Sequence, residues 1–128
     1  MVQKITSGVQ VSVETYYQAH QSVPLKNEYI FAYGITIVNL TTMPIRLVSR
    51  HWYIFDSNGL RREVEGMGVV GKQPIIDPND QFEYVSFVDL TSDMGKMHGT
   101  YMVENMFTKE LFEVIIPEFT MIAFPKLN

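Results

Sequence analysis

The chain has 128 residues, of which 46% are hydrophobic and 19% charged, and its formal net charge at pH 7 is −4. This length predicts one domain spanning residues 1–128, and the absence of cysteine excludes disulfide frameworks and thiolate metal sites and favours a reducing, cytoplasmic compartment. The negative charge argues against nucleic acid as a partner, and no apolar run approaches the roughly 20 residues of a membrane span, so no membrane partner is expected either.

The first part of the chain predicts two strands. Residues 9–17 alternate apolar and polar side chains with the period of two that is typical of a half-buried strand. This pattern stops at residues 18–27, which contain a proline, so they are expected to form a loop. Residues 29–40 are apolar on both faces, which predicts a central strand with Gly34 as its weak point.

The middle of the chain predicts a hairpin around Asn58 and Gly59. Residues 45–55 alternate again and carry Trp52 on the face that is expected to point into the core. Asn-Gly between two strand-like runs is the strongest short hairpin signal, because both residues tolerate positive φ. Residues 60–65 should therefore pair back on the strand before them.

The rest of the chain adds strands and no helix of three turns. Strands are expected at 81–90, 97–103 and 111–116, the last with a strand-like tail, and Pro117 restricts that junction to an edge or a bend. Seven to nine short strands predict an all-β fold, an antiparallel β-sandwich of the immunoglobulin or fibronectin type III kind, with a β-barrel as the alternative. Trp52 and Tyr101 fit the core tryptophan and the tyrosine corner of such sandwiches.

The segment shaped for a ligand or partner is a glycine-spaced loop of residues 66–74. Its glycines match G-x-G-x-x-G, but no helix follows them, so the dinucleotide-binding reading is rejected. Two readings remain open: a shaped interstrand loop that presents a partner-binding surface, and a nest of main-chain amides that holds a phosphate beside a lysine. The candidate binding residues are Gly66, Gly68, Gly71, Lys72 and Gln73.

The sequence gives no signal for catalysis, a cofactor or a metal. No serine stands in a nucleophile motif, and the three histidines His20, His51 and His98 have no metal-ligand spacing. Glu63 and Glu65 share one strand face, which is most often solvated. We therefore expect a non-enzyme without catalytic residues, a cofactor or a metal site.

These residues carry a resemblance to the ApaG family of small bacterial proteins. Residues 65–74, EGMGVVGKQP, are close to the family's E-G-x-G-V-V-G-x-Q-P. Arg50-His51-Trp52 and the segment from Met97 to Tyr101 support the likeness, which covers nearly the whole chain. The chain departs from the family pattern at Pro78-Asn79, where Pro-Gly is usual, and at Ser86-Phe87, where Ser-Gly is common.

The resemblance implies a fibronectin type III-like sandwich and a genetic association with cobalt resistance and magnesium efflux. It also implies a gene neighbourhood that includes a diadenosine tetraphosphate hydrolase, and the domain is fused to F-box proteins in eukaryotes. These implications favour a non-catalytic protein-interaction module with an unidentified protein partner. The alternative is a pyrophosphate or nucleotide sensor that uses the loop from Gly66 to Gly71 for a phosphate-containing small molecule. A metal-responsive role and self-association are left open.

Overall fold

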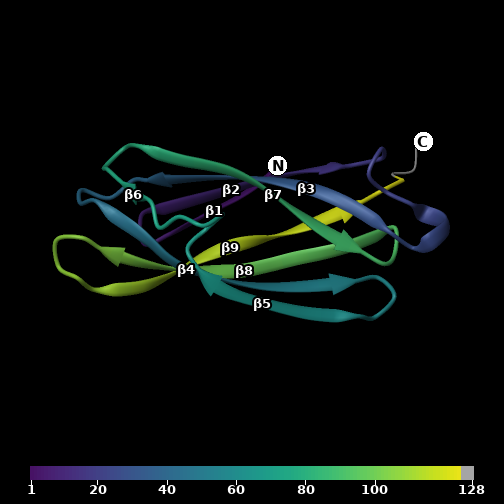
Figure 1. The fold of residues 1–128 in the computed structure, drawn as a ribbon. Coiled ribbons are helices and arrows are strands. Elements are labelled where there is room, and N and C mark those ends of the chain that lie inside the picture. The colour runs from purple at the N-terminus through teal and green to yellow at the C-terminus, as the bar shows by residue number, and fades with distance from the viewer. Residues whose placement is uncertain (125–128) are drawn as a thin grey trace.

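The computed structural model describes residues 1–124 and consists of two antiparallel sheets facing each other as a sandwich (Figure 1). In the first sheet the strand order is β1 (Val2–Thr6), β2 (Val9–Tyr17), β3 (Tyr29–Asn39) and β7 (Gln81–Leu90). In the second sheet it is β5 (Arg61–Met67), β4 (Ile45–Asp56), β8 (Met94–Asn105) and β9 (Leu111–Ile122), and the short β6 (Ile75–Ile76) also pairs with β4. These nine strands confirm the predicted β-sandwich.

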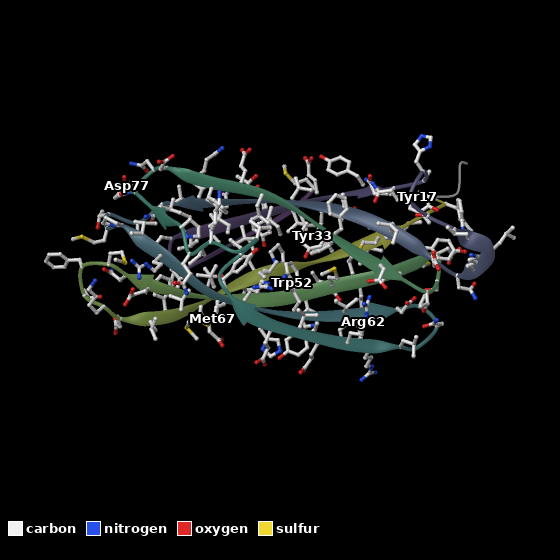
Figure 2. The ribbon with its side chains drawn as sticks, viewed as in Figure 1. Tyr17, Tyr33, Trp52, Arg62, Met67 and Asp77 are labelled. Carbon is white, nitrogen blue, oxygen red and sulfur yellow. The ribbon has the colours of Figure 1, made fainter. Side chains whose placement is uncertain are left out.

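The core lies between the two sheets and is built by the predicted alternation. Tyr33 of β3 and Trp52 of β4 lie between the layers in Figure 2, with their ring centroids 5.3 Å apart at 65°. Phe119 of β9 packs edge-on against the same indole at 5.9 Å and 89°. Trp52 is only 2% exposed, which confirms the face predicted for it. Edge-to-face contacts of this kind add to the stabilisation gained from burying the rings.

A β-bulge changes the phase of β4 before it reaches the core tryptophan. The register against β8 shifts between Leu47 and Ser49, so Val48 is inserted without a partner. Leu47 and Trp52 are both buried although one position is odd and the other even. The bulge also turns the Val48 carbonyl toward Gly68, whose amide donates a 2.7 Å hydrogen bond to it.

The structure contains elements that the sequence patterns did not predict. β1 precedes the first predicted strand and pairs with β2 from Val2 to Thr6. Within the expected loop 18–27, Pro24–Lys26 form a single 3-10 turn. β9 runs without interruption through Pro117, because it is an edge strand and its register against β8 shifts at Met97/Gly99. Among residues 1–124 there is no helix of a length and hydrophobicity that would cross a bilayer.

One side of the sandwich is bounded by two edge strands, β5 and β7. Arg62 of β5 reaches across to β7, where its Nη1 lies 3.2 Å from Asp89 Oδ1, and its Nη2 donates to the Asp89 carbonyl. This contact links the two sheets on the side where, within residues 1–124, neither edge strand pairs with a further strand. Arg62 can be followed in Figure 2 on the lower layer.

Candidate site beside the glycine loop

The glycine loop connects β5 to β6 and is folded tightly onto its own backbone. Gly68 has φ +66°, a left-handed conformation that glycine adopts without steric cost. A Cβ atom on Gly68 would lie 2.2 Å from the Lys72 carbonyl oxygen, so no side chain fits there. Only glycine satisfies both conditions at this position.

A tight turn forms the tip of the loop. Val69 and Lys72 exchange backbone hydrogen bonds of 2.8 and 2.9 Å, and the two residues between them, Val70 and Gly71, have φ +42° and +78°. Positive φ at both central positions is the type I′ arrangement. Val69 is 1% exposed and anchors the loop in the core, whereas the side chain of Val70 is 51% exposed at the tip.

Two polar side chains, one from β4 and one from the loop itself, tie the loop to β4. Arg50 Nη1 donates to the carbonyls of Met67, at 3.1 Å, and Gly68, at 2.9 Å. Gln73 Nε2 donates to the Val48 carbonyl at 2.9 Å. A Cβ on Gly66 would meet the Arg50 guanidinium at 2.7 Å, so the missing side chain makes room for this arginine. Arg50 was not among the predicted site residues, because nothing in its own strand marks it as a partner of the loop.

The predicted site residues therefore come together in one loop, and several of their polar groups are already satisfied. The amides of Gly68, Val69 and Lys72 each donate within the protein, and the guanidinium that lies against the loop contacts its carbonyls. A phosphate nest needs consecutive free amides that converge on the anion. The hydrogen bonding accords better with a shaped interstrand loop than with an open nest.

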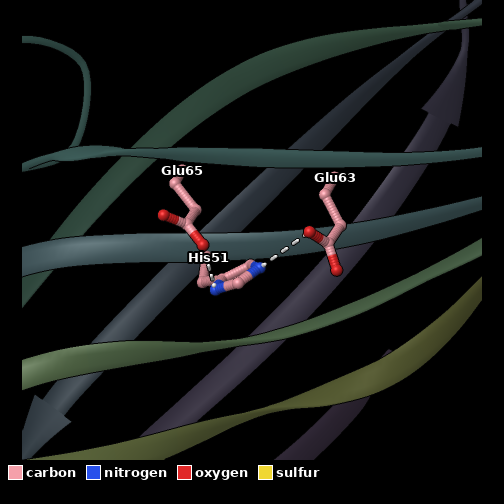
Figure 3. A group of neighbouring side chains, drawn as sticks. All are labelled: His51, Glu63 and Glu65. Carbon is pink, nitrogen blue, oxygen red and sulfur yellow. Dashed lines mark ion pairs between the residues drawn. The ribbon is translucent and has the colours of Figure 1, made fainter.

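A histidine and two carboxylates meet on the outer face of the second sheet, next to the loop (Figure 3). His51 of β4 is paired in register with Glu65 of β5, and the next outward position of β5 is Glu63. His51 Nδ1 lies 3.0 Å from Glu65 Oε1, and His51 Nε2 lies 3.8 Å from Glu63 Oε2. The two carboxylates thus approach the imidazole from its two nitrogens.

The same face carries four stacked rings along β4 and β8, which we call the ring ladder: His51, Tyr53, His98 and Phe55. Successive centroids are 4.5, 5.0 and 5.6 Å apart and the rings are within 15° of parallel. At the far end, the cationic groups of Arg61 and Lys96 lie 5.4 and 5.6 Å from the Phe55 centroid, in cation–π contact.

A shallow depression of about 390 Å³ connects the glycine loop to the ring ladder. It is lined by Gly66 and Met67 at the end of β5, by His51 with Glu65, and by Thr100 and Met102 of β8. Met67 is 68% exposed, so its thioether stands at the rim as an adaptable apolar contact. The loop and the ring ladder therefore form one continuous surface with apolar, aromatic and charged parts.

Comparison with known proteins identifies a family. The model of a family described as ApaG domain matches residues 19–105. A Protein ApaG from Brucella anthropi is 45% identical over 121 residues, covering 94% of this chain and 92% of that protein, and one from Brucella abortus is 42% identical over the same length. A putative ApaA protein from Bordetella pertussis has a solved structure with a TM-score of 0.86 and 40% identity, covering 89% of this chain and 92% of that one.

Proposed function

The chain belongs to the ApaG domain family, and from that premise we propose that it is a non-catalytic protein-interaction module whose contact surface is the ring ladder with the adjoining glycine loop. The observation that carries the proposal is the ladder itself. Four parallel rings lie on the outer side of a sheet, where no other part of residues 1–124 forms a layer over them. Aromatic side chains are enriched at the energetic centres of protein interfaces.

The way these rings are held supports the same role. Each belongs to β4 or β8, neighbouring strands in the interior of the sheet, so little conformational entropy is lost when a partner covers them. The ladder is bordered by Arg61 and Lys96 at one end and by Glu63 and Glu65 along one side. An apolar centre within a charged border is the usual anatomy of a specific interface.

We place this activity in the cytoplasm, in line with the cysteine-free sequence. On this proposal, the family's association with cobalt resistance and magnesium efflux is indirect and depends on the partner. The partner is a protein that presents a surface complementary to the ring ladder and its charged border.

Site-specific photo-crosslinking in living cells tests the proposal. A photoreactive amino acid at Thr100, beside the ladder, should give discrete protein adducts, which mass spectrometry identifies. The same group at Thr36, on the outer side of the first sheet, is the matched control and should not give them. Adding Tyr53→Glu to the Thr100 probe should abolish the adducts. Equal adducts from both probes, or adducts that survive Tyr53→Glu, would place the interface elsewhere.

The second candidate function is a phosphate sensor. It can be tested at Lys72, the exposed lysine of the loop. Lys72 is exposed and its backbone, not its side chain, closes the turn, so Lys72→Ala should leave stability unchanged. We expect calorimetric titration of pyrophosphate and diadenosine tetraphosphate to show no micromolar binding. Salt-sensitive micromolar binding that is lost in Lys72→Ala would favour the sensor over the interaction module.

A further inference from the structure

His51 has one nitrogen without a hydrogen-bond partner among residues 1–124. This Nε2 is shielded from solvent, although the side chain as a whole is 27% exposed. The nearest acidic oxygen, Glu63 Oε2, is 3.8 Å away, which is beyond hydrogen-bonding distance. A shielded polar atom without a partner is uncommon and costs free energy, and an ion or a water molecule is one ordinary explanation for it.

The other nitrogen of the ring determines what Nε2 can do. Glu65 Oε1 lies 3.0 Å from Nδ1, and a carboxylate at this distance favours the tautomer of the neutral imidazole that carries its proton on Nδ1. In that tautomer Nε2 carries the free lone pair, and Figure 3 shows Glu63 on the Nε2 side of the ring. A carboxylate that holds the far nitrogen of a metal-bound histidine is the recurrent outer partner of metal sites.

The distances suit a small ion between Nε2 and Glu63. Two bonds of about 2.0–2.1 Å at a tetrahedral angle separate the ligand atoms by about 3.4 Å. The observed 3.8 Å needs a movement of only a few tenths of an ångström, and Glu63 is a long side chain with 62% exposure that can make it. The imidazole of His51 stacks on the ring of Tyr53 with the centroids 4.5 Å apart, and this stacking holds the imidazole plane in place while Glu63 moves.

We propose that His51 Nε2 and Glu63 bind a divalent transition-metal ion such as Zn²⁺, with Glu65 positioning the imidazole through Nδ1. Water molecules complete the coordination, since the chain supplies two ligands. An imidazole with a carboxylate favours Zn²⁺ and its neighbours over Mg²⁺, which prefers six oxygen ligands. The inference goes beyond the proposed interaction function and stands whether or not a protein binds the ring ladder.

Calorimetric titration of the full chain with ZnCl₂, and separately with MgCl₂, tests the site. His51→Phe removes both nitrogens but keeps a ring on Tyr53, and it should weaken Zn²⁺ binding at least tenfold, as should Glu63→Gln. Glu65→Gln should weaken it about tenfold through loss of the outer partner. His98→Phe is the matched control, because it removes a half-buried imidazole of the same ladder outside the cluster, and it should change the affinity less than twofold.

Nitrogen NMR of the histidine side chains gives a readout that needs no variant. One equivalent of Zn²⁺ should shift the Nε2 resonance of His51 while Nδ1 keeps its proton. The proposal fails if no saturable micromolar Zn²⁺ binding occurs, if His51→Phe binds as the wild type does, or if His98→Phe loses binding equally. It also fails if Mg²⁺ binds as tightly as Zn²⁺, since the cluster would then be only an acidic surface.

Discussion

Gly68 and Lys72 approach so closely that a Cβ on Gly68 would lie 2.2 Å from the Lys72 carbonyl oxygen. The contact is between backbone atoms of one loop, so neither side can move away without opening the turn that anchors Val69.

Gly68→Ala should destabilise the fold more than Gly71→Ala. Both glycines have positive φ, which costs a residue with a Cβ roughly 1–2 kcal/mol. Only Gly68 adds a backbone clash, because a Cβ on Gly71 would meet no atom of residues 1–124 within 4 Å beyond its chain neighbours. Gly34→Ala, in open space at ordinary φ, is the control and should change stability by less than about 1 kcal/mol. Urea unfolding measures all three, and equal losses for Gly68→Ala and Gly71→Ala would contradict the clash.

Trp52→Ala should cost about 3–5 kcal/mol of unfolding free energy, a large share of the stability of a domain. The indole is 2% exposed and wedged between Tyr33 and Phe119, so its removal leaves a cavity that the two rings cannot fill. Trp52→Phe keeps part of the ring volume and should cost less. A urea midpoint for Trp52→Ala close to that of the wild type would show that the core does not depend on this ring.

The hydroxyl groups of Tyr84 and Tyr101 hydrogen-bond to each other inside the sandwich, and a double-mutant cycle should reveal their coupling. Removing either hydroxyl leaves the other buried without this partner, at a cost of about 1–3 kcal/mol. Removing both as Tyr84→Phe/Tyr101→Phe should cost less than the sum of the single changes. Strict additivity in urea unfolding would show that the two hydroxyls do not depend on each other.

The same pair predicts a loss of stability in alkali. Burial raises the pKa of Tyr84 and of Tyr101 above the ordinary value of 10.0. Above about pH 10 the unfolded chain releases these protons and the folded chain retains them, so the unfolding free energy falls as pH rises. Between pH 9 and about 11, the urea midpoint of Tyr84→Phe/Tyr101→Phe should fall less steeply than that of the wild type. If the urea midpoints of the wild type and the double variant fell equally steeply with pH, the two tyrosines would not be the source of the loss of stability.

The lowered pKa of Asp56 predicts a loss of stability in acid, smaller than the loss that the tyrosine pair predicts in alkali. Burial raises its pKa, but hydrogen bonds from Ser92 and Thr91 outweigh burial, so the pKa lies below the ordinary value of 3.8. The stability that the carboxylate contributes is present above that value and is lost as pH falls through the lower folded pKa. The difference in urea midpoint between wild type and Asp56→Asn should therefore shrink between pH 5 and about 2. If this difference in urea midpoint did not change with pH, the negative charge of Asp56 would not contribute to stability.

The sequence predicted the sandwich and the face of Trp52, because alternation records which residues point inward. It did not predict the bulge at Val48, which changes the parity of β4 without leaving a compositional mark. β1 was missed because its alternation is weak, with every residue at least partly exposed. Pro117 was expected to restrict its strand to an edge or a bend, and β9 is indeed an edge strand.

The histidine–carboxylate cluster depends on a detail of turn geometry that the sequence leaves open. A two-residue Asn58-Gly59 turn would place Gly66 opposite His51. The observed loop has three residues, with the Asp56 amide bonded to the Leu60 carbonyl, so the register moves by one and Glu65 takes that place. The prediction that the chain holds no metal site was made from spacing along the chain, which does not record contacts made across a hairpin, and it stays a prediction.

The contact between Arg62 and Asp89 also bears on how the protein behaves at high concentration. In the described part of the chain no strand pairs with the outer side of β5, and an unpaired edge is a template on which a second copy can add a strand and begin a fibre. Here Arg62 crosses that opening to Asp89, and Arg61, Glu63 and Glu65 project from the opposite face of β5. A second copy that paired with β5 would have to desolvate these charged side chains, which disfavours polymerisation through this edge.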